Sequence, residues 1–298
     1  MNSVTESLAH FIVSHPDPDI PPPVRVRVHA RYARLVALAC AGADELEPPI
    51  MARTLLALSD ACEVGLLGLP GLLGVCEAPV VTALAMDSAA RTAGADLNAW
   101  PEGPVLAAAM AAAELRAQTL SACLDAVAIG AEVGLRVEAA LQPALSNAGW
   151  RRFAVASRLG AAAAAGRLLG LDRDQLVTAL GLAATQIAAR ASSTVSLSWA
   201  RAAGDGVEAA LLAQAGMTGP AAPLEGRRGL AQVLATTDLA GADTLHDLGR
   251  RWLVLELLPN PDDSPQTTAT AALRAAQAFG DDQPWTSLHR ACLSAGGA

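Results

Sequence analysis

The chain has 298 residues, of which 52% are hydrophobic and 17% are charged, and its formal net charge is −8. This balance predicts a globular protein with a large buried core and excludes a disordered chain. Consecutive basic residues occur only as pairs, so the sequence lacks the basic stripe that a nucleic-acid partner requires.

The composition favours an all-α fold, because aromatic residues make up 3% of the chain and abundant alanine lets helices approach closely. Turn-forming residues and helix caps divide the chain into a series of helices. Asp172, for example, is followed three residues later by Gln175, which is a capping-box pattern. In chain order, helices are predicted from Thr5 and over residues 24–40, 49–62, 79–92, 104–116, 119–141, 151–169, 172–189, 201–215, 244–250 and 268–279.

Three segments are predicted not to be helical. Residues 252–258 (WLVLELL) form an apolar run that is typical of a strand, and a break rich in Pro and Asp follows at 259–265. Gly65, Gly68 and Gly71 recur without a preceding strand, so we predict a loop there rather than a nucleotide-binding fingerprint.

Several charged residues have a structural interpretation. Arg25, Arg31 and Arg34 recur at helical spacing, which indicates a solvent-exposed helix face. Arg201 and Asp205 lie four residues apart and are interpreted as a surface ion pair.

Apolar runs and cysteines predict the compartment. The longest apolar runs, such as residues 105–113, are about half of the ~20 residues that a bilayer span requires. The N-terminal residues lack the basic region and apolar stretch of a secretion signal. The five cysteines show no metal-ligand spacing, and their odd number favours reduced thiols packed in the core. We therefore expect a cytoplasmic protein that spans no membrane and binds no metal.

Residues 149–226 combine a glycine–tryptophan start, an Ala-rich helix ending in RLLGLD, an LGLAATQ helix and an LLAQAGMTGP turn that leads into LEG. This combination resembles the MmgE/PrpD family, which includes 2-methylcitrate dehydratase, cis-aconitate decarboxylase and iminodisuccinate epimerase. Weaker similarity extends over most of the chain. The resemblance implies an all-helical domain, an α+β lid domain and a homodimer. Because family members are longer, we expect a helical domain over residues 1–250 and a truncated or vestigial lid, with one strand and one helix, over 251–298.

The resemblance also implies where the family's proton-transfer groups fall. The histidine of a G-[FW]-H-x-T motif corresponds to Arg151, and the histidine that follows an acidic segment corresponds to Trp100. The K-x-x-H-x-G motif falls on Val195, Ser198 and Ala200. A guanidinium cannot give up its proton near neutral pH, so the family's His and Lys catalytic set is absent from these positions.

We therefore predict a repurposed enzyme of the lyase, isomerase or cyclase type that uses no cofactor. It would act on a largely apolar small-molecule intermediate of specialised biosynthesis, held in a reactive conformation. Asp96 is the candidate base and Arg151 the candidate anchor for a carbonyl or carboxylate. The remaining candidate substrate-binding residues are Trp100, Trp150, Arg152, Ser198, Trp199 and Arg201.

Two alternatives stay open. The chain could be a non-catalytic dimeric binding or partner protein, because a fold persists when its chemistry is lost. It could also be a lyase that still acts on a small carboxylate through residues placed elsewhere, for which His29, His246 and His289 are available.

Overall fold

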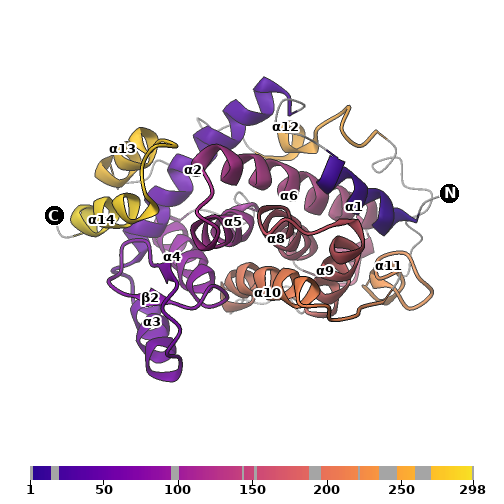
Figure 1. The fold of residues 1–298 in the computed structure, drawn as a ribbon, viewed down its shortest axis with the longest axis horizontal. Coiled ribbons are helices and arrows are strands. Elements are labelled where there is room, and N and C mark those ends of the chain that lie inside the picture. The colour runs from indigo at the N-terminus through magenta and orange to yellow at the C-terminus, as the bar shows by residue number, and fades with distance from the viewer. Residues whose placement is uncertain are drawn as a thin grey trace.

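A computed structural model describes residues 3–14, 20–94, 101–142, 144–150, 153–187, 196–220, 222–234, 247–258 and 270–296. Within these ranges the chain forms α-helices and one two-stranded hairpin, so the predicted all-α class is confirmed. The two ends of the chain lie at opposite ends of the long axis (Figure 1).

The longer helices are α1 (Val4–Ser14), α2 (Pro22–Gly42), α3 (Glu47–Leu58), α4 (Ala78–Thr92), α5 (Gly103–Leu115), α6 (Leu120–Leu141), α8 (Ala154–Leu168), α9 (Arg173–Thr185), α10 (Ser196–Gln214), α13 (Thr270–Ala278) and α14 (Trp285–Gly296). The short elements are α7 (Ala144–Asn147), α11 (Leu230–Leu234), α12 (Leu253–Leu257), β1 (Val64–Gly65) and β2 (Leu72–Leu73).

The helix starts follow from local sequence. Proline occupies the first turn of α2, α3, α4 and α5, where its missing N–H would have no helical partner. The Thr119 hydroxyl accepts the Ala122 N–H and caps α6. The predicted capping box is also confirmed, because Asp172 and Gln175 exchange hydrogen bonds of 2.9 and 3.0 Å at the start of α9.

The predicted strand at 252–258 is wrong, because this segment forms the short helix α12. The buried Glu132 carboxylate of α6 accepts the N–H groups of Leu253 and Val254, each at 3.0 Å. These bonds satisfy donors that a helix start leaves without partners, so a distant side chain stabilises the helical turn. Within the predicted helix 244–250, residues 247–250 form a turn, and 244–246 lie outside the described ranges.

The predicted loop around Gly65 contains the antiparallel pair β1–β2, in which Val64 faces Leu73 and Gly65 faces Leu72. Each strand has only two residues, so the segment carries no alternating pattern long enough to indicate a strand.

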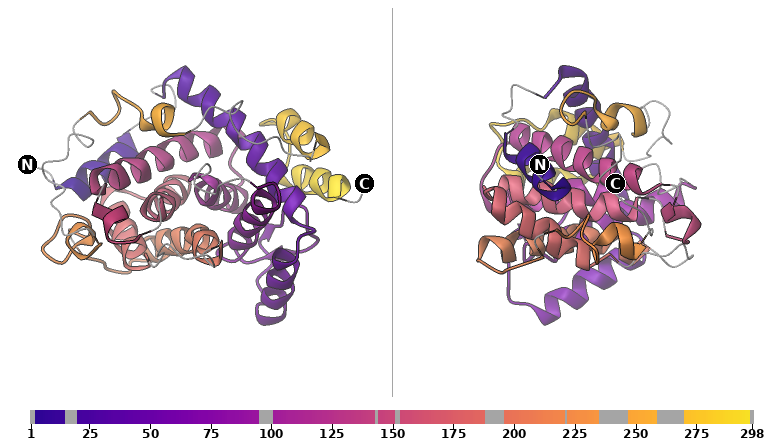
Figure 2. Two further views of the ribbon diagram at one scale, coloured as in Figure 1. Left: turned by 180° about the vertical axis from the view of Figure 1, so that it is seen from behind. Right: turned by 90° about the vertical axis from the view of Figure 1, so that its right-hand side faces the viewer.

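The centre of the molecule is the packing of α6 against α8 (Figures 1 and 2). A Cβ atom on Gly134 would overlap the carbonyl oxygen of Ala156, and one on Gly130 would overlap that of Gly160. The two backbones therefore touch directly, and the alanine-rich sequence of α8 is what allows this distance.

The C-terminal helices pack back onto the helical body. Helix α12 packs on α6 and α2, whereas α13 and α14 pack on α2, and all of these contacts join segments far apart in sequence. A disulfide joins Cys40 of α2 to Cys292 of α14 across 252 residues. The prediction of reduced thiols is therefore wrong for these two residues, because spacing along the chain does not reveal that α14 returns to α2. The division into domains 1–250 and 251–298 stays a prediction.

None of the helices in the described ranges combines the length and apolar character needed to cross a bilayer.

Candidate functional site

The starts of α5, α8 and α10 meet at one place in the fold. The Ser157 hydroxyl of α8 donates to the carbonyl oxygen of Pro101, just before α5, at 2.8 Å. The Trp199 ring of α10 lies over Gly103, where a Cβ atom would come within 2.5 Å of the ring. Helix starts carry partial positive charge, which favours an electron-rich oxygen atom where the first amides are not already bound by a side chain.

The start of α8 is fixed by a buried carboxylate. Glu138, 3% exposed at the end of α6, accepts the N–H groups of Phe153, Val155 and Ala156, the last two at 3.1 and 3.0 Å. Phe153 has a φ of 64°, a left-handed conformation that a bulky side chain rarely adopts. Because Glu138 occupies these amides, they are not open to a ligand.

A buried ion pair links α8 to α10. The Nε and Nη2 atoms of Arg158 lie 3.0 and 2.6 Å from Oδ2 of Asp205, and Nη2 is 3.5 Å from the carbonyl oxygen of Ser198. The Arg158 and Asp205 side chains are 3% and 15% exposed. The predicted surface pair of Asp205 with Arg201 is therefore wrong, and Arg201 is exposed.

A second buried ion pair links α2 to the residue before α5. Arg31 and Glu102 are 1% and 3% exposed and are hydrogen bonded through Nε and Oε1. The interpretation of Arg31 as part of a solvent-exposed face is therefore wrong. Its partner lies 71 residues away, which spacing within one helix cannot show.

Two buried polar atoms beside this pair have no hydrogen-bond partner, namely Oε2 of Glu102 and the Tyr32 hydroxyl oxygen. A cavity of about 10 Å³ lies between them and α6, which is the space of about one water molecule. Burial raises the pKa of Tyr32 above its usual value, so its phenol stays neutral.

The candidate site residues fall into two groups. Asp96, Trp100, Arg151 and Arg152 lie outside the described residues. The other four are described. Trp199 is 5% exposed, and Ser198 is half-buried with its carbonyl oxygen near Arg158. Trp150 is half-buried against the core, and its backbone N–H donates to the carbonyl oxygen of Leu145 at 3.0 Å. Arg201 faces solvent.

Sequence reasoning missed Glu138, Arg158 and Glu102 as organisers of the converging helix starts. A buried carboxylate or guanidinium is costly without a partner, so each such residue indicates an ion pair or a cap. The partners themselves come from other helices and leave no local signal.

Of the histidines considered for a retained lyase, His246 lies outside the described residues and His289 lies away from the converging starts. Nε2 of His289 is 2.9 Å from Oε2 of Glu114, near the C-terminal end of α5. Glu114 is therefore separated from Gly103 by most of the length of α5, which is about 16 Å. His29 is exposed on α2. In the part of the chain that the structure describes, no group of three metal-ligating side chains occurs.

Comparison with known families gives one finding that bears on this site. The family model described as the MmgE/PrpD N-terminal domain matches residues 6–241. The match includes the starts of α5, α8 and α10 and the residues before them. No curated protein matches the chain.

Proposed function

The chain belongs to the MmgE/PrpD family, and from this we propose that it is a repurposed enzyme of the lyase, isomerase or cyclase type. Membership provides a scaffold typical of lyases and dehydratases. The proposed substrate is a largely apolar intermediate of specialised biosynthesis, and the proposed location of the enzyme is the cytoplasm.

One observation carries the proposal on substrate polarity. The charged groups at the converging helix starts are already matched, since Arg158 pairs with Asp205, Arg31 pairs with Glu102, and Glu138 binds backbone amides. A small tricarboxylate would need several cations that are free to bind it. The described part of this region therefore favours a substrate of low charge, with the Trp199 ring close by.

In the proposed mechanism, Asp96 removes a proton and Arg151 binds a carbonyl or carboxylate oxygen of the substrate. Because Glu138 already binds the first amides of α8, the partial positive charge of the α5 and α10 starts would stabilise negative charge on that oxygen. Trp100, Trp150, Trp199, Ser198, Arg152 and Arg201 would complete the substrate surface. Holding the substrate in a reactive conformation contributes several kcal/mol without further ionisable groups.

A second candidate is a non-catalytic binding or partner protein on the same scaffold. It is favoured by the pairing of the buried acids and by the distance of His289 from the converging starts. A third candidate, a lyase for small carboxylates, predicts turnover of 2-methylcitrate or cis-aconitate.

The test joins genetics to an assay with purified protein. The gene is deleted in its host, the metabolites that accumulate are isolated, and each is incubated with the purified chain. We expect turnover of an accumulated intermediate and none of 2-methylcitrate or cis-aconitate. Asp96→Asn is expected to slow turnover by about 10²–10⁴-fold, as loss of a general base does.

The matched control is Asp60→Asn, which makes the same change at an exposed position outside the site. If the catalytic proposal holds, only the Asp96 variant slows turnover. Rescue of the deletion by Asp96→Asn and Arg151→Ala as fully as by the wild type would instead support the binding protein. Turnover of a tricarboxylate would overturn the substrate proposal.

We also propose that the chain forms a homodimer. Helix α3 projects from the body, and Leu46 and Leu58 at its ends are 75% and 77% exposed (Figures 1 and 2). Light scattering of the wild type is expected to give twice the monomer mass, and Leu58→Glu is expected to give the monomer mass. Val233→Glu, at a 69% exposed position on α11, is the control that should remain dimeric.

A further inference from the structure

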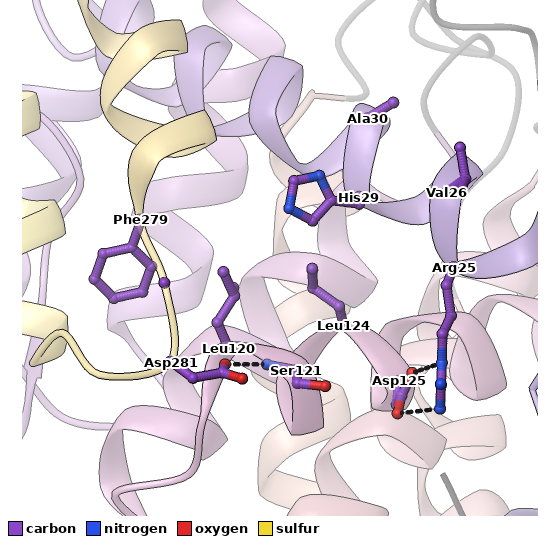
Figure 3. Close-up of a pocket in the computed structure, with 11 residues that line it drawn as sticks. Arg25, Val26, His29, Ala30, Leu120, Ser121, Leu124, Asp125, Phe279 and Asp281 are labelled. Carbon is purple, nitrogen blue, oxygen red and sulfur yellow. Dashed lines mark hydrogen bonds and ion pairs between the residues drawn. The ribbon is translucent and has the colours of Figure 1, made fainter. Parts of the chain in front are cut away.

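A separate pocket of about 580 Å³ lies between α2, α6 and the connection from α13 to α14 (Figure 3). Its volume is within the range of small-molecule sites in proteins. Leu120 and Leu124 of α6 and Phe279 provide apolar walls, and the imidazole of His29 extends toward the same space. The rest of the lining is Arg25, Val26, Ala30, Ser121, Asp125, Gly280 and Asp281.

The end wall of this pocket is held in place by several independent contacts. Asp281 accepts the N–H of Ser121 at 2.8 Å, and the Trp285 indole donates to the carbonyl oxygen of Gln118 at 3.0 Å. The Phe279 and Trp285 rings pack with their centroids 5.3 Å apart. The Cys40–Cys292 disulfide holds α14 on α2. The pocket is therefore largely formed before a ligand binds, which lowers the entropic cost of binding.

The charges around the pocket do not balance. Arg25 binds Asp125 through two hydrogen bonds of 3.0 and 2.9 Å, and the Asp125 side chain is 4% exposed, so these two charges cancel (Figure 3). Asp281 makes no ion pair among the described residues and is exposed. The lining thus contains apolar walls, the His29 imidazole and one carboxylate, Asp281, that accepts the Ser121 N–H but forms no ion pair among the described residues.

We propose that this pocket binds a cationic amphiphile, meaning a molecule with a protonated amine and an extended apolar body. The ammonium group contacts the Asp281 carboxylate and the Ser121 hydroxyl. The apolar body lies along Leu120, Leu124 and Phe279. Arg25 is the arginine of the described lining and is bound to Asp125, so a carboxylate ligand would be repelled by Asp281 more than it would be attracted.

The pocket is separate from the converging helix starts. Leu124 lines the pocket, whereas Ala131, seven residues further along α6, faces the cavity beside Glu102. This spacing corresponds to about 10 Å along the helix. The binding proposal therefore does not depend on the proposed enzymatic function.

The test is calorimetric titration of the full chain with n-octylamine, n-octanoate and n-octanol below their micellar concentrations. We expect n-octylamine to bind most tightly, because it offers both the charge and the apolar chain. In the series from n-butylamine to n-octylamine, each methylene group is expected to tighten binding by about two- to fourfold. Tighter binding of n-octanoate, or affinity that does not change with chain length, would overturn the proposal.

Asp281→Asn is the decisive variant, because the amide still accepts the Ser121 N–H while the charge is lost. We expect it to weaken n-octylamine binding by about two- to fivefold, the contribution of an exposed ion pair, and to leave n-octanol unchanged. Asp282→Asn is the matched control, since it removes the neighbouring exposed charge from outside the pocket lining.

Ala30→Phe fills the pocket from α2 and is expected to abolish binding of all three probes. Near-ultraviolet circular dichroism checks that each variant keeps the wild-type fold. Equal effects of the Asp281 and Asp282 variants, or full binding by a folded Ala30→Phe variant, would show that the probes bind elsewhere on the surface.

Discussion

A single buried carboxylate fixes the start of each of two helices, α8 and α12. Glu138 binds three amides at the start of α8, and Glu132 binds two amides at the start of α12. A side chain from one helix thus replaces the local cap that α8 lacks, since Phe153 at its N-cap position offers no side-chain acceptor.

Replacement of Glu138 tests this interpretation. Glu138→Ala leaves several buried N–H groups without an acceptor, so we expect the free energy of unfolding to fall by about 2–4 kcal/mol. Glu138→Gln keeps one acceptor oxygen and is expected to lose less. Urea denaturation measures both. Glu208→Ala, at an exposed position within α10, is the control and should change stability little. Equal losses at Glu138 and Glu208 would contradict the capping role.

At the scale of helices, glycine and alanine set the distance between elements. Gly134 meets the backbone of Ala156, whereas Gly166, near the end of α8, faces the flexible side-chain end of Leu176. The two positions therefore separate the effect of helix propensity from the effect of backbone contact.

Gly134→Ala is expected to lower the free energy of unfolding by about 1–3 kcal/mol, although alanine favours helix over glycine by ~1 kcal/mol. The added methyl group would push α6 away from α8. Gly166→Ala is expected to be less destabilising, because a leucine side chain can move. Thermal and urea denaturation of both variants provide the comparison, and the opposite order would show that backbone contact does not limit this packing.

The disulfide also joins two helices, α2 and α14, that are far apart in the sequence. Thiol titration of the unfolded, unreduced chain is expected to detect only Cys62, Cys76 and Cys123, and titration after reduction should detect all five cysteines. Reduction is expected to lower the free energy of unfolding by about 2–4 kcal/mol, because the bridge closes a long loop. A Cys292→Ser variant should match the reduced wild type. Five reactive thiols before reduction would contradict the bridge.

At the scale of the whole molecule, local signals predicted most of the helices. Pro22, Pro79 and Pro104 mark helix starts, and Asp172 marks another through its own side chain. Such signals depend on neighbours within a few residues, so they are readable from one sequence.

Tertiary contacts explain the predictions from the sequence that were wrong. Residues 253–257 are apolar and short, so the choice between strand and helix depends on Glu132, which lies more than one hundred residues earlier. Arg31 is buried for a similar reason, since its partner is Glu102. Helix α14 was not predicted, although its Trp285 and Cys292 are buried against α2 and its neighbours.

The candidate site was only partly predictable. The family resemblance located the segments before α5, α8 and α10, and the family match covers the same region. The convergence of these helix starts depends on Ser157, Arg158 and Glu138, whose partners lie in segments far along the chain or in another helix. Neither periodicity nor motif spacing reports such partners.

The stability of the whole fold at acid pH depends on its ion pairs, because a carboxylate that is paired in the folded chain binds a proton less readily than it does in the unfolded chain. Hydrogen bonding to Arg136 lowers the pKa of Asp247 below 3.8, and hydrogen bonding to Arg251 lowers that of Glu256 below 4.5. The stability that these two ion pairs contribute is present at pH values above the pKa of each carboxyl in the unfolded chain. It is lost as the pH falls through the lower pKa of the folded chain.

Asp247→Asn should therefore be less stable than the wild type at pH 7, and the difference should shrink toward pH 3. Urea midpoints between pH 3 and 7 measure this, with Asp60→Asn as the exposed control. A difference that stays constant with pH would show that Asp247 stabilises the fold through its shape rather than its charge.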